Sequence, residues 1–234
     1  MTANGHNLNA EAILALAPTV ILTDYTIGPV EVQMQLRDAG IPVVVLDDRR
    51  TADTVTSQIH EVSEALGVPE AGEQLAERTA KEIPAARQRV DRLRSVNGQR
   101  SPRAVFLYLR GRSGTYDWFG KDTGADDLIA ALGATDVATA SGVKGYQPLN
   151  AEALAAAAPD VVLVMTDGLA SVGGVDGLLG LPGVAETPAG RTRCVIDMAD
   201  TEILSFGTRF APTIDALGDA LYRSGAVAEQ AARR

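Results

Sequence analysis

The chain has few of the residues that cross-link a protein or anchor it in a membrane. Its 234 residues include a single cysteine, Cys194, which excludes an internal disulfide and any cysteine-based metal cluster. No window approaches the roughly 20 apolar residues that a membrane helix requires. The opening residues 1–6 have neither a basic nor an apolar run, so the sequence as it stands predicts no export signal.

Aromatic residues and positive charge are also scarce. Aromatics make up 4% of the chain, so each tyrosine deserves to be located. Lys and Arg number 21 against 30 Asp and Glu, and the net charge of −9 argues against a nucleic-acid-binding protein, which needs a basic surface. The apolar content of 46% and the charged content of 22% are those of a globular protein with room for one large domain or two modest ones.

One fifteen-residue segment occurs almost twice. Residues 8–22 and 149–163 are identical at ten of fifteen positions. Each copy predicts a helix that begins after an asparagine N-cap (Asn9 or Asn150), ends near a proline and leads into an apolar strand. Two such units indicate two similar α/β lobes, and such lobes commonly enclose a ligand cleft.

The pattern along the chain divides it into three parts. Residues 1–68 alternate helix and uninterrupted apolar strand, which is typical of a parallel sheet covered on both faces. Residues 69–98 are polar with helical periodicity, broken only by Pro84, and predict either one long, kinked helix joining the lobes or a surface helix hairpin. Residues 99–234 predict a larger α/β lobe. The fold class is therefore α/β, with two lobes joined by a long backbone helix.

The N-terminal lobe has only two clear strands in this sequence. A two-stranded parallel sheet is marginal on its own. The lobe is therefore either unusually small or incomplete, with its opening strands missing from this reading frame.

Tyr108 and Arg110 are the strongest candidates for a binding site. They stand at positions i and i+2 of a predicted strand, residues 103–110, so both leave the same face just before a Gly-rich loop. Ligands of open α/β sheets bind beyond the carboxyl ends of strands. A guanidinium beside a phenol favours the phenolate, which is a hard oxygen donor suited to ferric iron. The simpler alternative is a tyrosine that only caps its strand.

Of the two histidines, His6 is a candidate for the binding site and His60 is not. If the repeated units superpose, residues 5–7 occupy the place of residues 146–148, and His6 would face Tyr108 from the opposite lobe. The alternative for His6 is an N-terminus without fixed structure. His60 lies on a predicted amphipathic helix and is expected to be a solvated surface group.

The sequence contains no pattern of a known catalytic site. Neither histidine stands in the pattern of a hydrolytic triad, and there is no phosphate-binding loop, dinucleotide-binding loop or EF-hand. We therefore expect a binding protein rather than an enzyme.

With these residues assembled, the chain resembles the haemin-binding substrate-binding proteins of bacterial ABC importers, of the helical-backbone class. The segments that carry the resemblance are residues 5–14, 39–44, 106–111, 123–129, 158–163 and 174–179. In actinobacterial-type members, a histidine of the N-terminal lobe and a tyrosine of the C-terminal lobe hold the haem iron, and an arginine supports the tyrosine. The resemblance implies that His6 and Tyr108 bind the iron and that Arg110 supports Tyr108.

Three further residues belong to the site that the resemblance implies. Residues 206–209 resemble a Gly-Pro-Arg loop of many relatives, although Thr208 replaces the proline, and Arg209 is the expected partner of a haem propionate. Tyr116 is a rival ligand from the C-terminal lobe, and Tyr146 is a weaker third.

The implied function is to bind haem, as haem b, in the cleft between the lobes and to deliver it to the permease and ATPase of an ABC importer. Members of the family carry a signal peptide, often with a lipid-anchored cysteine, which this sequence does not contain, so we expect a truncated or misplaced start. The implied location is extracytoplasmic, as a cell-surface lipoprotein or in the periplasm. A cobalamin or ferric-siderophore binder of the same class is the alternative, and a cytosolic α/β enzyme or sensor is a more distant one.

Overall fold

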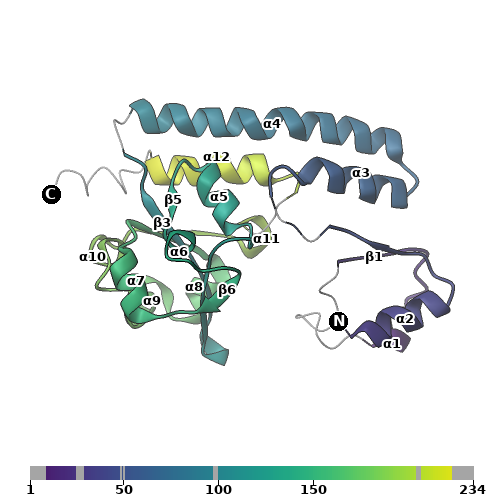
Figure 1. The fold of residues 1–234 in the computed structure, drawn as a ribbon, viewed down its shortest axis with the longest axis horizontal. Coiled ribbons are helices and arrows are strands. Elements are labelled where there is room, and N and C mark those ends of the chain that lie inside the picture. The colour runs from purple at the N-terminus through teal and green to yellow at the C-terminus, as the bar shows by residue number, and fades with distance from the viewer. Residues whose placement is uncertain are drawn as a thin grey trace. The chain divides into compact units, whose positions relative to one another are not determined.

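The computed structural model describes residues 9–24, 29–47, 49, 51–96, 100–203 and 207–222. The chain forms two compact units, one of residues 1–49 and 53–78 and the other of residues 50–52 and 79–234. Each unit is described by itself below (Figure 1).

The first unit alternates helix and strand. Its elements are α1 (Ala10–Leu14), β1 (Ile21–Thr23), α2 (Val30–Asp38), β2 (Val43–Val45), α3 (Val55–Ala65) and the first part of α4 (Pro69–Val96). Strands β1 and β2 are parallel, with Ile21 opposite Val43. Their connection runs through α2, as parallel strands require a crossover.

The second unit contains the larger sheet and most of the helices. After the rest of α4 it comprises β3 (Arg103–Arg110), the 3-10 turn η1 (Gly111–Ser113), β4 (Thr115–Phe119), α5 (Ala125–Ala131), β5 (Thr135–Asp136), α6 (Val137–Ala140), β6 (Tyr146–Pro148), α7 (Ala151–Ala157), β7 (Val161–Met165), α8 (Thr166–Ser171), α9 (Gly174–Leu179), α10 (Pro188–Thr192), β8 (Val195–Met198), α11 (Asp200–Ile203) and α12 (Phe210–Tyr222). None of the helices within the described ranges is long and apolar enough to cross a bilayer.

The sheet of the second unit is mixed. Its strand order is β6-β4-β3-β7-β8, and β5 pairs with the start of β3. Strands β3, β7 and β8 are parallel and are linked through helices, whereas η1 joins β3 to β4 as an antiparallel pair. The short turn makes that orientation necessary, because parallel neighbours need a long crossover.

Strand β3 separates the core from the face that carries the candidate site. The side chains of Val105, Leu107 and Leu109 point to one face and are buried in a cluster with Trp118 of β4 and Leu154 of α7. Residues at even positions of β3 point to the other face, since side chains alternate along a strand. Burial decreases along that face, from Phe106 at 0% exposure to the partly exposed Tyr108 and Arg110.

The sequence repeat is also a repeat of backbone structure. The Asn9 side chain accepts a hydrogen bond from the backbone amide of Ala12, and Asn150 accepts one from Ala153. After the helix of each copy, an alanine before the proline takes a left-handed conformation, with φ of 48° at Ala17 and 45° at Ala158. The prediction of two capped helices followed by strands is confirmed in both copies.

Helix α4 is continuous from Pro69 to Val96, with Pro84 inside it. The helix-hairpin alternative is therefore wrong for these residues. Within the second unit, α12 runs beside α4 (Figure 1), and Gly218 allows the approach: a Cβ at Gly218 would lie 2.5 Å from Cγ2 of Val90. An ion pair between Arg89 and Asp215 joins the same two helices.

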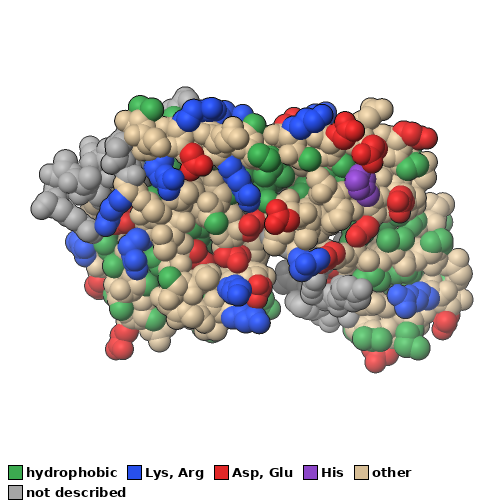
Figure 2. All heavy atoms as spheres, turned by 45° about the horizontal axis from the view of Figure 1, so that its top comes forward, with side chains coloured by type: hydrophobic (Ala, Val, Ile, Leu, Met, Phe, Trp, Pro, Cys, Tyr) green, Lys and Arg blue, Asp and Glu red, His purple; other side chains and the backbone are tan. Residues whose placement is uncertain are grey.

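The surface in Figure 2 carries both signs of charge. On the face shown, Lys and Arg side chains alternate with Asp and Glu, without one continuous basic area.

Candidate ligand-binding site

Tyr108 lies on β3 between an aromatic ring and a guanidinium. Its ring stacks on Phe119 of β4, with 5.5 Å between the centroids and 10° between the planes. The Cζ atom of Arg110 lies 4.5 Å from the Tyr108 ring centroid. The guanidinium therefore makes a cation–π contact with the phenol, and the sequence prediction that these two residues share a face is confirmed.

Helix α11 connects Arg110 with Arg209. One Nη atom of Arg110 lies 3.5 Å from a carboxylate oxygen of Asp200, and Arg209 donates a hydrogen bond of 2.9 Å to the carbonyl of Thr201. Because Asp200 and Thr201 are consecutive, the two arginines are held at one place in the fold. Arg209 is exposed, so its remaining N–H groups are available to an anion.

Tyr146 extends the aromatic surface across a third strand. It lies on the edge strand β6 opposite Phe119, with 5.9 Å between the ring centroids, and it is 70% exposed. Tyr108, Phe119 and Tyr146 thus form one row of rings across β3, β4 and β6, which we call the aromatic row. Flat apolar ligands bind to surfaces of this kind, with a few polar groups at the margin.

Tyr116 points away from the aromatic row. It is opposite Leu109 in the β3–β4 register, so it shares the face of Leu109 and Trp118 and packs against the buried cluster there. The structure brings Tyr108, Arg110, Tyr146 and Arg209 to one side of the unit and places Tyr116 on the other face of the sheet.

Sequence reasoning did not find Phe119 or Asp117. Asp117 is opposite Tyr108 on β4, and burial raises its pKa above the ordinary value of an aspartate. The alternation of residues 115–119 is a strand signal that could have indicated both. This strand was not predicted because the Gly-rich segment before it, residues 111–114, was interpreted as a loop.

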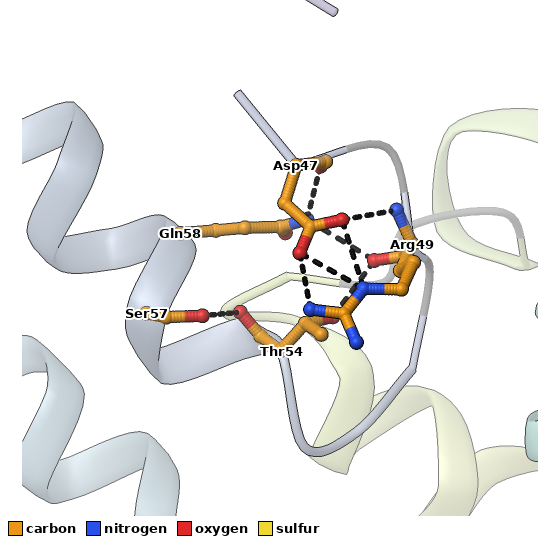
Figure 3. A network of polar contacts seen from close by, with 5 residues as sticks. All are labelled: Asp47, Arg49, Thr54, Ser57 and Gln58. Carbon is orange, nitrogen blue, oxygen red and sulfur yellow. Dashed lines mark hydrogen bonds and ion pairs between the residues drawn. The ribbon is translucent and has the colours of Figure 1, made fainter. Parts of the chain in front are cut away.

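In the first unit, a polar network links Asp47 and Arg49, which follow β2, to Thr54 and Gln58 at the start of α3 (Figure 3). Asp47 accepts hydrogen bonds from the backbone and side chain of Arg49, and the side-chain amide of Gln58 donates to the Asp47 carbonyl. The Thr54 hydroxyl donates to the Arg49 carbonyl. The Arg49 side chain holds the pKa of Asp47 below its usual value.

The two histidines are placed differently. His6 lies outside the described residues, and its predicted role stays a prediction. His60 is on α3, with Nε2 lying 3.2 Å from a carboxylate oxygen of Glu73 in an exposed setting. Within the described ranges, no group of three or more His, Cys, Asp or Glu residues is arranged to hold a metal ion. Cys194 is buried, and burial raises the pKa of its thiol to about 11.

The mixed sheet, the long helix and a partly exposed tyrosine supported by arginine define a ligand-binding protein built from α/β units. The sequence pattern of the periplasmic binding protein family matches residues 2–201, and the chain belongs to that family. The family and the solved relatives below are named as binding proteins, which supports the expectation of a binding protein rather than an enzyme.

Several solved structures are similar to this chain. The periplasmic haem-binding protein RhuT from Roseiflexus sp. RS-1, in apo form, is 40% identical with a TM-score of 0.87, covering 94% of this chain and 81% of its own. The haem-binding protein HmuT gives the same identity and TM-score over 94% of this chain and 71% of its own. The periplasmic haem-binding protein BhuT, in complex with two haems, is 36% identical with a TM-score of 0.84, over 95% and 81%.

HmuT has also been crystallised as variants in which a histidine, a tyrosine or an arginine is replaced by alanine. In those variants the tyrosine and the arginine are two positions apart. Tyr108 and Arg110 have the same spacing.

A curated relative is an uncharacterized ABC transporter substrate-binding lipoprotein, YvrC, of Bacillus subtilis (strain 168). It is 22% identical over 218 residues, which are 92% of this chain. The chain spans 66% of the length of that relative.

Proposed function

We propose that this protein binds haem and presents it to an ABC importer. The observation that carries the proposal is Tyr108, which is partly exposed at the end of β3 and contacts Arg110 and Phe119 face-on. Its relatives RhuT, HmuT and BhuT, at 36–40% identity, are named as haem-binding proteins.

In this proposal Tyr108 binds ferric iron through its phenolate oxygen and His6 supplies the second axial ligand. Axial ligands are the main control that a protein has over haem iron. Arg110 supports Tyr108 through the cation–π contact with its ring. Tyr116 is the rival ligand, and its packing on the opposite face of the sheet favours Tyr108.

The rest of the haem would use the other residues predicted for the site. Tyr146, 70% exposed at the margin of the aromatic row, offers an aromatic surface to the porphyrin. The exposed guanidinium of Arg209, held by Thr201, suits a propionate, because Arg recognises carboxylates through two parallel hydrogen bonds. We propose haem b as the form that is carried.

The partners are the importer's permease and ATPase, and the location is outside the cytoplasmic membrane. Membership of the periplasmic binding protein family and the lipoprotein relative support both statements. We further propose that residues 1–68 and 99–234 are the two lobes that dock on the permease, and that residues 69–98, continuous as α4 to Val96, are the rigid connection.

Titration of the purified protein with haemin, followed by the Soret band, tests the function. A saturable shift is expected for the wild type, with altered position and weaker binding in Tyr108→Phe and His6→Ala. Tyr116→Phe is the matched control and should bind like the wild type. No shift in the wild type would exclude haem and favour a cobalamin or siderophore ligand. An unchanged spectrum in both Tyr108→Phe and His6→Ala would exclude the ligand assignment while leaving haem binding intact.

A further inference from the structure

We infer that Phe119 is a positioning residue for haem binding: it holds the Tyr108 ring in the orientation that aims the phenol oxygen at the iron. This inference rests on the proposed function. Phe119 itself would not bind the iron, and it acts through Tyr108.

Phe119 and Arg110 approach the Tyr108 ring from opposite directions along β3. Arg110 follows Tyr108 by two positions on the same face. Phe119 is opposite Phe106 in the β3–β4 register, two positions before Tyr108. The Arg110 guanidinium lies over the Tyr108 ring, with its Cζ at 4.5 Å from the centroid, and the Phe119 ring stacks nearly parallel to the Tyr108 ring at 5.5 Å.

Tyr108 needs such a support because the core does not hold it. The side chain is partly exposed, and the outer torsion of a tyrosine has a broad, weakly restricted energy profile. Rotation about the outer torsion leaves the phenol oxygen in place but turns the plane of the ring. The ring plane would then change its angle to an oxygen–iron bond. Rotation about the first torsion moves the oxygen itself. The contacts of the Tyr108 ring with Arg110 and Phe119 restrict rotation about both torsions.

Phe119 is placed to give this support because its own ring is fixed. It contacts the buried Phe106 ring at 5.5 Å on one side and the Tyr146 ring at 5.9 Å on another. The next residue, Gly120, lies so close to the adjoining segment that a Cβ there would meet the Val143 carbonyl oxygen at 2.4 Å. Backbone hydrogen bonds of 3.0 Å from Gly120 to the Gly145 carbonyl and from Lys121 to the Val143 carbonyl hold the end of β4 against that segment and so keep the phenyl ring in place.

A double-mutant cycle separates positioning from direct contact with the porphyrin. Haemin affinity and the visible band of ferric tyrosinate are measured for the wild type, Phe119→Leu, Tyr108→Phe and the double variant. Phe119→Trp, which keeps an aromatic plane, is the conservative control. Proton NMR of the apo proteins reports the ring-current shift of the Tyr108 ring protons, which depends on Phe119 and needs no haem.

Phe119→Leu is expected to weaken haemin binding about threefold to tenfold, as the loss of one aromatic pair allows, and to shift the tyrosinate band. Phe119→Trp should restore both. In the Tyr108→Phe background, Phe119→Leu should have no further effect. An equal loss in both backgrounds would show direct contact with haem and overturn the inference. A wild-type tyrosinate band and affinity in Phe119→Leu would also overturn it, whereas absence of haemin binding by the wild type would remove the proposed function as well.

Discussion

Ala17 and Ala158 occupy the same position in the two copies of the repeat, and both have a left-handed backbone, with φ of 48° and 45°. Each follows a helix that begins with an asparagine cap and precedes a proline. The left-handed region costs a residue with a Cβ roughly 1–2 kcal/mol. The chain therefore repeats a strained residue as well as a favourable cap.

Replacing Ala158 by glycine should stabilise the protein. Glycine takes a positive φ without the Cβ clash and is preferred at the end of a helix, so we expect the free energy of unfolding to rise by about 1 kcal/mol. Ala156→Gly is the matched control: it lies inside α7, where glycine costs about 1 kcal/mol relative to alanine. Urea unfolding of both variants should give changes of opposite sign, and a loss of stability in both would contradict the interpretation of strain at Ala158.

The contact between α4 and α12 should depend on the absence of a side chain at Gly218. Although alanine is the better helix former, Gly218→Ala is expected to lower the free energy of unfolding by about 1–3 kcal/mol, because its Cβ would overlap Val90. The double variant Gly218→Ala with Val90→Ala should recover part of the loss. Thermal unfolding of Gly218→Ala, Val90→Ala and the double variant measures the three changes in stability. Strictly additive losses would show that the two residues do not compete for space.

Stability should fall at alkaline pH because two buried groups resist losing their protons. Burial raises the pKa of Cys194 from 9.0 to about 11 and that of Tyr222 from 10.0 to about 12. The unfolded chain releases these protons first, so the stabilisation is complete below pH 9 and is lost as the pH rises through the folded values. Urea unfolding between pH 8 and 11 should show the decline.

Cys194→Ala isolates one part of that decline. The portion that begins near pH 9 should disappear in this variant, while the later portion from Tyr222 remains. An identical pH profile in the variant and the wild type would show that Cys194 does not contribute.

Arg110 and Arg112 provide a paired test of charge at the candidate site. Arg110 contacts the Tyr108 ring and Asp200, whereas Arg112 is exposed on η1. Arg110→Ala should reduce haemin affinity about twofold to fivefold, since a solvent-exposed cation–π contact contributes about 0.5–1 kcal/mol. Arg112→Ala should bind haemin like the wild type. Equal losses in the two variants would mean that overall charge, rather than the contact with Tyr108, governs binding.

The sequence was sufficient where local pattern decides the structure. Apolar runs located β3 and β7, and the asparagine caps located the starts of α1 and α7. The shared face of Tyr108 and Arg110 follows from the period of a strand alone. These features depend only on residues a few positions apart, so they can be predicted from the order of residues alone.

The partners of those residues could not be predicted, because they depend on register and on contacts distant in sequence. Asp200 meets Arg110 across 90 positions, and Phe119 reaches Tyr108 only because η1 sets the pairing of β3 with β4. The neighbouring Asp126 and Asp127 accept backbone hydrogen bonds from Gly124 and Ala52 respectively, and their adjacency in the sequence does not indicate these partners. His6 lies outside the described residues, so its assignment stays a prediction.

The alternation of β3 has a consequence for how this protein can change. On one face of β3, Val105, Leu107 and Leu109 are buried in the apolar cluster. The other face ends in the partly exposed Tyr108 and Arg110. Substitutions at those two positions can alter which ligand is accepted while disturbing little of the packing that folds the unit. Ligand preference can therefore change through one side of a single strand while the packing on its other side stays the same.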